Sequence, residues 1–494
     1  MVMLSTLAAP SFLGGCQAGP AAKAAGIAFA MNYFKVSESD LKKVLTAALE
    51  KGGDYADLYF EHSYRNNIGL QDGAVNRASS NIDFGMGVRV LSGDQTGYAY
   101  VENVTLEEML KAARTAARIA NGNATAGPVN LSELKPGLDL YHVQTAWDEV
   151  AINDKMPYLQ QLNDKIFAKD QRVMKVQASL GDTTSHIFFC NSEGEMYYDY
   201  RPMVTLGAVC IMEEKGHIEN SYAARAFRMG AEFLTDALID ELAQEAVDKT
   251  AILFQAIKPK GGEMPVVMGA GGSGILLHEA IGHAFEADFN RKNTSIFSDQ
   301  LNKKICNEHI NVVDDGTIPF NRGSVNIDDE GHPTQRNVLI EKGVLKNYMI
   351  DRLGSRRMGM PMTGNSRRQD YGFEPTSRMT NTFIENGPDK NEDIIASIEY
   401  GLYARSMGGG SVNPLTGAFN FSVSEGYIVR NGKICEPVRG ATLIGTGTQI
   451  LQDIDMVGQN CATGQGMCGS SSGSVPTDVG QPLIRVSKIT VGGR

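Results

Sequence analysis

Hydrophobic and polar positions in the first part of the chain alternate between a helical and a strand-like spacing. Residues 37–51 have the spacing of an amphipathic helix, and residues 54–63 then alternate as a strand does. Asp72-Gly73 and Ser92-Gly93-Asp94 are typical of hairpin turns. A capping box that begins at Thr105 starts a second helix. The pattern therefore predicts a helix, antiparallel hairpins and another helix.

The same order of patterns returns about 120 residues further along the chain, which suggests an internal duplication. A helix is predicted over residues 153–169, and hairpins turn at residues 192–194 and 215–216. A second helix is predicted over residues 234–256. Few residue identities match between the two copies, so the repeat lies in the pattern of elements.

Short strands and turn sequences dominate from Pro265 onward. Residues 338–349 predict a hairpin around residues 341–343, and Asn431-Gly432 is the clearest hairpin turn in the chain. One helix, over residues 391–403, is expected to interrupt these strands. Glycine is dense throughout this part. A twisted antiparallel sheet or a barrel-like domain fits these features best.

The patterns together predict an α+β fold. Its N-terminal α/β region contains two similar units of helices and antiparallel strands, and its C-terminal domain is mainly antiparallel β and barrel-like. The expected divisions of the 494 residues are a leader, two α/β units and a β-rich domain, at residues 1–35, 36–125, 141–258 and 264–494.

Composition excludes several classes of protein. The net charge of -11 argues against a nucleic-acid surface, which needs clustered Lys and Arg. No apolar run approaches the roughly 20 residues of a membrane-spanning helix. Seven cysteines in a chain of this length do not indicate a disulfide framework. The chain is therefore expected to be an ordinary globular protein with free or metal-binding thiols.

The first thirty residues differ in composition from the rest and carry one charged side chain, Lys23. Leu13-Gly14-Gly15-Cys16 is similar to the lipobox of bacterial lipoproteins. No Lys or Arg precedes the apolar run, although an export signal requires a positive segment there. Two interpretations stay open: an export or lipid-anchoring segment modified at Cys16, or a disordered leader.

A glycine run, Gly269 to Gly274, follows a predicted strand and matches the pattern G-x-G-x-x-G. A dinucleotide site also needs a second parallel strand that ends in an acidic residue. That strand is missing from the pattern, and no Lys-Ser/Thr pair follows as in a phosphate-binding loop. A tight turn that leads into the next helix is therefore favoured over nucleotide binding.

That next helix carries His278-Glu279 and, five residues after the first histidine, His283. Zinc peptidases usually place two histidines at i and i+4, about 40° apart around a helix, whereas i+5 separates them by about 140°. A π-bulge would bring both rings to one side, and Gly282 would let the backbone deform at little cost. The alternative is two partly buried helix histidines beside a solvated glutamate.

In the functional interpretation, His278 and His283 bind Zn²⁺, and Glu279 is the general base that activates the zinc-bound water. A catalytic zinc needs a third protein ligand and an open position. Spacing alone leaves five candidates for that ligand: Glu286, Asp288, Cys306, Cys461 and Cys468.

The run LLHEAIGHAFEADFNRK at residues 276–292 resembles the signature of the TldD/PmbA metallopeptidases, specifically of their TldD branch. The resemblance is dense from about residue 264 to the end and looser from about residue 36. Further matching runs are VVDDGT (312–317), GSVNIDDEG (323–331), RMTN (378–381), FSVSEGY (421–427), GATLIGTG (440–447) and GQPLIRVSKITVGG (480–493).

The resemblance implies a zinc metallopeptidase that hydrolyses unfolded or extended peptides. It implies zinc ligands at His278, His283 and Cys468, with Glu279 as the catalytic base. It also implies a cytoplasmic protein that pairs with a related PmbA/TldE-type subunit lacking the zinc motif, or else with a second copy. Cys461, seven residues before Cys468, is a competing ligand.

Two other functions remain as alternatives. One is a non-catalytic protein-binding regulator, because this family has been described as a modulator of DNA gyrase; the other is a nucleotide-dependent oxidoreductase that uses the glycine run. For the peptidase, Tyr348, Arg352 and Tyr371 are candidates for stabilising the oxyanion, and the sequence does not rank them.

Overall fold

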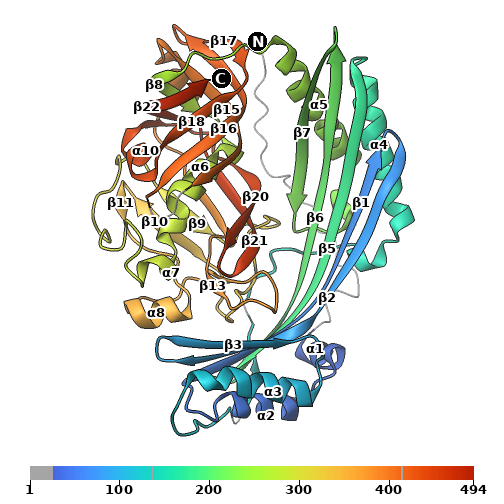
Figure 1. Cartoon of the computed structure of the whole chain (residues 1–494), viewed down its shortest axis with the longest axis vertical. Helices are drawn as coiled ribbons and strands as arrows, with labels where there is room; N and C mark the ends of the chain where they lie inside the picture. The colour runs from blue at the N-terminus through green and yellow to red at the C-terminus, as the bar shows by residue number, and fades with distance from the viewer. Residues whose placement is uncertain (1–25, 129, 136, 413–415, 494) are drawn as a thin grey trace.

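Two large parts lie side by side in the computed structural model, which describes residues 26–128, 130–135, 137–412 and 416–493. Figure 1 shows a long N-terminal sheet on one side and the C-terminal domain on the other. Helices cover the outer face of the sheet, and the C-terminal domain covers its inner face. The central part of the sheet is thus buried between two layers.

Along the chain, the N-terminal part has helices before and after each set of long strands. Its elements are α1 (Ile27–Phe34), α2 (Glu38–Ala48), β1 (Tyr55–Gln71), β2 (Ala74–Ser92), β3 (Gln95–Val101), α3 (Leu106–Ala116), β4 (Ser132–Glu133), α4 (Ile152–Lys169), β5 (Val173–Asn191), β6 (Glu195–Glu214), β7 (His217–Phe227) and α5 (Asp236–Ala251).

The two predicted α/β units share one sheet. Each unit has a helix, three antiparallel strands and a second helix, and the sheet order is β3-β2-β1-β5-β6-β7 with β4 on β6. The first strands of the two units, β1 and β5, pair antiparallel from Asp57↔Asn191 to Gln71↔Gln177. Corresponding strands therefore meet at the centre of the sheet, as expected when two similar units associate edge to edge around a local twofold axis.

The folded chain begins before the expected boundary at residue 36. Residues 27–34, within the segment expected to be a leader, form α1, and Ala30 and Phe34 of this helix are buried against β1 and β5. Phe34 lies 5.6 Å from Phe60 between ring centroids. Cys16 and the lipobox-like run lie outside the described residues.

The C-terminal part contains short helices among many strands. Its elements are β8 (Gly262–Met268), α6 (Ile275–Leu277), α7 (Ala287–Asn290), β9 (Val312–Asp315), β10 (Arg336–Glu341), β11 (Val344–Leu345), α8 (Arg352–Met358), β12 (Ser366–Arg367), β13 (Thr376–Ser377), β14 (Asn381–Ile384), α9 (Asn391–Ala396), β15 (Tyr400–Val412), β16 (Ala418–Arg430), β17 (Lys433–Val438), β18 (Ala441–Thr446), α10 (Gly447–Asp453), β19 (Ile454–Val457), β20 (Ala462–Ser470), β21 (Gly473–Gln481) and β22 (Ile484–Gly493).

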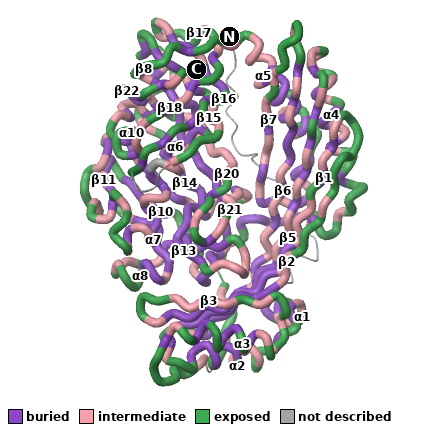
Figure 2. The backbone as a smooth tube through the Cα atoms, viewed as in Figure 1, coloured by how far each residue is buried: buried purple, intermediate pink, exposed green. Residues whose placement is uncertain are grey.

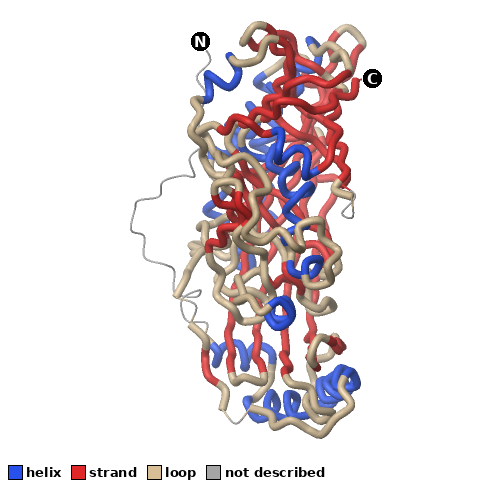
Figure 3. Tube along the Cα trace, turned by 90° about the vertical axis from the view of Figure 1, so that its left-hand side faces the viewer, coloured by secondary structure: helices blue, strands red, loops and turns tan. Residues whose placement is uncertain are grey.

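A closed barrel confirms the barrel-like prediction. Strands β15, β8, β22, β18 and β16 pair in that order, and β16 pairs back with β15. Figure 3 shows these strands gathered at one end, while loops dominate the middle of the molecule. A second sheet runs β11-β10-β9-β14-β21-β20. One apolar core joins the barrel, this sheet and the helix with the two histidines, and Figure 2 shows the buried strands.

The helix predicted over residues 391–403 is shorter than expected. It ends at Ala396, and Tyr400 already begins β15. The reason is tertiary, because Leu402 and Ala404 are fully buried where β15 pairs in parallel with β8. None of the helices in the described part of the chain is long and apolar enough to span a membrane.

Candidate metal centre

The helix that carries the histidine motif is distorted at the motif itself. A regular turn, α6, passes into a π-helical turn over His278–Gly282 and then into a 3₁₀ turn over His283–Phe285. The π-helical turn adds the residue that an i+5 spacing requires, so the predicted distortion is confirmed. The two imidazole centroids consequently lie 5.3 Å apart with their planes at 79°.

Gly282 has a different role from the expected one. Its φ of -57° and ψ of -51° are ordinary helical values that any residue adopts, so the expectation of a glycine needed for backbone deformation is wrong. Space is the constraint instead, because an added Cβ would lie 2.3 Å from Sδ of the fully buried Met379. Packing against Met379 therefore explains the glycine.

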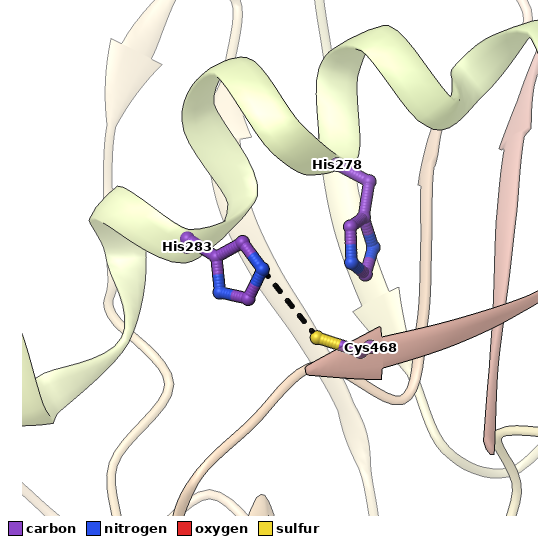
Figure 4. A group of neighbouring side chains, drawn as sticks. All are labelled: His278, His283 and Cys468. Carbon is purple, nitrogen blue, oxygen red and sulfur yellow. Dashed lines mark hydrogen bonds between the residues drawn. The ribbon is translucent and has the colours of Figure 1, made fainter. Parts of the chain in front are cut away.

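Cys468 of β20 faces the two histidines, as Figure 4 shows. One ligand atom from each of His278, His283 and Cys468 lies within 4.8 Å of the others. The Cys468 Sγ is 3.6 Å from Nε2 of His283. Cys468 and His278 are each only 1% exposed, so the three donor atoms converge in a nearly dry site.

The other candidates for a third ligand are engaged elsewhere. Asp288 forms ion pairs with Arg291 and Lys292, and Cys306 is buried in the apolar core. The Cys461 Sγ lies 3.2 Å from the carbonyl oxygen of Ile384. These three side chains are therefore not part of the group around His278.

Glu286 lies behind His283, and its Oε1 is 3.2 Å from Nδ1 of that ring. Burial acts to lower the pKa of His283, but Glu286 and Cys468 together outweigh this effect and raise that pKa well above its usual range. With Nδ1 facing Glu286, Nε2 of the same ring faces Cys468. A carboxylate behind a ligating histidine is a common way to orient the ring.

Arg378, which the sequence analysis did not identify, contacts both Glu286 and the hairpin that carries Cys468. It is fully buried, its Nε lies 3.7 Å from Glu286, and its guanidinium donates to the carbonyl oxygens of Cys468 and Gly473 and to Ser472. It therefore ties Glu286 to the hairpin that carries Cys468. The only sequence signal was its place in the run RMTN.

The electrostatics of the group favour metal binding. Burial acts to raise the pKa of the Cys468 thiol, but His278 and His283 together hold that pKa well below its usual range. Both ring nitrogens of His278 are buried without a hydrogen-bond partner. Orphaned buried nitrogens are costly unless something binds them. Two imidazoles and a thiolate form a donor set that fits zinc and leaves a fourth position open.

The glycine run positions this group. Gly271 to Gly274 form a 3₁₀ turn that packs on the β20–β21 hairpin. A Cβ on Gly274 would lie 2.6 Å from the backbone nitrogen of Gly480, and a Cβ on Gly464 would lie 2.6 Å from Cα of Gly272. This close approach accounts for the glycines as a tight turn and sets the distance between the histidines and Cys468.

Glu279 lies on the π-helical turn directly after His278 and is partly buried. The three residues considered for oxyanion stabilisation have other contacts. Tyr348 donates to the carbonyl of Phe297 at 2.6 Å, Arg352 pairs with Glu193, and the amide of Tyr371 donates to Glu61. The structure brings none of them into the group around His278.

The buried donor set and the two-part fold define a class, namely a protein with a candidate metal site whose two histidines lie on a π-distorted helix. Comparison with known proteins identifies the family. Models of the PmbA/TldA metallopeptidases match domain 1 at residues 56–120, the central domain at 146–254 and the C-terminal domain at 261–493. The chain belongs to the PmbA/TldD metallopeptidase family.

Similar proteins place the chain in the TldD branch. It is 38% identical to the metalloprotease TldD homolog of Haemophilus influenzae, over 93% of this chain and 97% of that protein. It is 27% identical to the zinc metalloprotease TldD homolog of Saccharolobus solfataricus, over 91% of this chain and 99% of that protein.

Solved structures show the same fold. A protein from Thermotoga maritima, described as a candidate modulator of a DNA gyrase, has a TM-score of 0.73 at 21% identity and covers 92% of this chain and 100% of its own. TldE from Thermococcus kodakarensis has a TM-score of 0.71 at 20% identity, with coverage of 92% and 100%.

Proposed function

We propose that this chain is a zinc metallopeptidase that hydrolyses peptide bonds in unfolded or extended peptides. The observation that carries the proposal is the buried group of His278, His283 and Cys468, with Glu279 on the same π-helical turn. Its relatives are named metalloproteases, which supports a proteolytic activity.

The proposed roles of the residues follow from their chemistry. His278, His283 and Cys468 would hold the metal. Zinc, when bound, makes a water molecule more acidic and polarises a carbonyl group. Glu279 takes the proton from the attacking water and passes it to the leaving amine. Glu286 keeps His283 oriented through the contact to Nδ1.

The edge of the second sheet offers a way to hold an extended peptide. In the described part of the chain, β20 pairs with β21 alone and forms the end of its sheet. Met467 and Gly469, on either side of Cys468, are exposed. A peptide that added a strand to this edge would be held through main-chain hydrogen bonds, which tolerate varied side chains.

The proposal is tested by zinc content and peptide cleavage in the wild type and in Glu279→Gln. We expect the variant to retain zinc and to lose cleavage by roughly 100- to 10,000-fold, because general base catalysis contributes about that much. Glu263→Gln is the matched control, since Glu263 is exposed and pairs with the exposed Lys488. Full cleavage by zinc-loaded Glu279→Gln would exclude the mechanism, whereas zinc-loaded wild type that cleaves no peptide would favour a non-catalytic regulator.

The similarity to a TldE structure supports a partner. We propose that the chain pairs with a PmbA/TldE-type subunit, or otherwise with a second copy, in the cytoplasm. Size-exclusion chromatography with light scattering, alone and after co-expression with such a subunit, distinguishes a heterodimer, a homodimer and a monomer.

A further inference from the structure

A cavity of about 340 Å³ lies between the inner face of the N-terminal sheet and the C-terminal domain. Met467, Ser474 and Pro476 of the β20–β21 hairpin form one wall. Met467 directly precedes Cys468 on β20, and successive side chains of a strand point to opposite faces. The cavity and the metal group therefore lie on opposite faces of one hairpin.

Positive charge dominates this cavity, which we call the arginine cavity, although the whole chain has a net charge of -11. Two carboxylates, Glu61 and Asp329, are among its lining residues. Six arginines also line it: Arg65, Arg201, Arg228, Arg322, Arg367 and Arg368. A cavity with this excess of guanidinium groups attracts anions.

Three of these arginines have acidic partners within the protein. Arg201 lies 2.7 Å from both Asp199 and Asp329. Arg65 pairs with Asp83, and the guanidinium group of Arg368 lies 3.8 Å from the carboxylate of Asp57. Their charges are accounted for by the fold.

The other three have no such partner. In the described part of the chain, no carboxylate oxygen lies within 4.0 Å of a guanidinium nitrogen of Arg228, Arg322 or Arg367. Arg228 and Arg367 are only 5% and 4% exposed. Arg228 donates to the carbonyl of Arg322 and Arg367 to that of Met379, at 3.1 and 2.9 Å. Nε of Arg322 is buried without a partner. Buried cations without counter-charges are costly to the fold.

Their titration agrees with this arrangement. Burial, together with neighbouring arginines, lowers the pKa of Arg228 to about 10 and that of Arg367 to about 9, although nearby acidic groups act in the opposite direction. The carboxylate of Asp478 accepts a hydrogen bond from the backbone amide of Arg322 at 2.7 Å and not from a guanidinium. Asp199, Asp478 and Asp329 lie near enough to act on Arg228, Arg322 and Arg367, respectively, but none of them forms an ion pair with the guanidinium group.

We propose that the arginine cavity binds a carboxylate group of a peptide, either on an acidic side chain or at the C-terminus. Guanidinium groups bind carboxylates through paired, charge-assisted hydrogen bonds. Ile187, Met203 and Pro476 line the same cavity and would cover the carbon chain that carries the carboxylate. A bare inorganic anion would leave these apolar groups uncovered. The choice of a peptide as the ligand rests on the proposed peptidase function.

The test measures binding directly, by fluorescence anisotropy, on full-length, zinc-loaded Glu279→Gln protein. Four labelled peptides differ only in Glu against Gln at one position and in a C-terminal acid against an amide. We expect at least one acidic form to bind about tenfold more tightly than its neutral counterpart. Adding Arg322→Gln or Arg367→Gln should remove this preference. The control Arg336→Gln, at an exposed arginine paired with Glu385, should preserve it.

Equal binding of all four peptides overturns the inference. The inference is also overturned if the preference for the acidic peptides persists in Arg322→Gln and circular dichroism shows that this variant is folded. Arg322 lies at the partly exposed rim of the cavity. Inorganic phosphate that binds in an Arg322-dependent manner, without any preference among the peptides, overturns the peptide assignment. If the wild type cleaves peptides but shows no binding preference, the carboxylate site is refuted and the proposed peptidase function stands. A binding preference without any cleavage refutes the peptidase and leaves the carboxylate site in place.

Discussion

The Cys468 side chain combines burial with a lowered pKa, and a thiol in that state is an effective metal ligand. Burial alone would keep the proton on sulfur, and the two imidazoles reverse that effect. The backbone of the same residue accepts a hydrogen bond from Arg378. Single residues at this centre are therefore set in both charge state and position by neighbours that are distant in the chain.

Replacing this thiol should remove the metal. We expect Cys468→Ser to reduce bound zinc from about one per chain to near zero at micromolar protein, because a hydroxyl is a poor zinc ligand. Cys461→Ser is the matched control, because its sulfur contacts a backbone carbonyl instead. Mass spectrometric metal analysis after dialysis makes the measurement. Equal zinc in both variants would remove Cys468 from the ligand set.

At the scale of elements, the centre depends on how the motif helix is placed on the β20–β21 hairpin. The π-helical turn brings the two histidines to one side, and the glycine turn before it sets the distance to the hairpin. Gly274 has a φ of -60°, so its backbone needs no glycine. The lack of a side chain is what matters, because the neighbouring atoms belong to the backbone of Gly480.

A methyl group at this contact should separate the two elements. Gly274→Ala should lower the free energy of unfolding by about 1–3 kcal/mol and weaken zinc binding, because the opposing backbone cannot move aside cheaply. Gly272→Ala, two residues earlier, should change stability by less than about 0.5 kcal/mol, since its nearest neighbour would be 4.0 Å away. Denaturant unfolding and zinc titration compare the pair. Similar effects of both substitutions would contradict the packing argument.

At the scale of the whole molecule, buried ion pairs join the N-terminal sheet to the C-terminal domain. Arg89 of β2 lies between Asp57 of β1 and Glu330 of the C-terminal domain, with both distances at 2.5 Å. All three side chains are nearly inaccessible to solvent. Arg201 bridges Asp199 and Asp329 in the same way. The relative position of the two parts, and so the arginine cavity, depends on these networks.

Removing one member of such a network leaves buried charges uncompensated. Arg89→Met should lower the free energy of unfolding by about 3–5 kcal/mol and increase proteolysis between the two parts. Arg336→Met, which breaks the exposed pair with Glu385, should cost less than about 1 kcal/mol. Denaturant unfolding and limited proteolysis provide the comparison. A small effect of Arg89→Met would show that the interface is held mainly by apolar contacts.

Local sequence was sufficient for features that depend on residues close together in the chain. The turns at Asp72-Gly73 and Asn431-Gly432, the cap at Thr105 and the order of helices and hairpins follow from backbone preferences and hydrophobic spacing. The i+5 spacing of His278 and His283 likewise predicted a π-distorted helix, because helix geometry is local. The role of Glu279 stays a prediction.

Tertiary structure alone decided what depends on distant segments. It ended the helix at Ala396 where β15 pairs with β8, and it assigned Gly282 to a contact with Met379. It also brought Cys468 to the two histidines across 185 residues and collected the arginines of the cavity from both parts of the chain. Such distances depend on how sheets and helices pack, and no local preference encodes them.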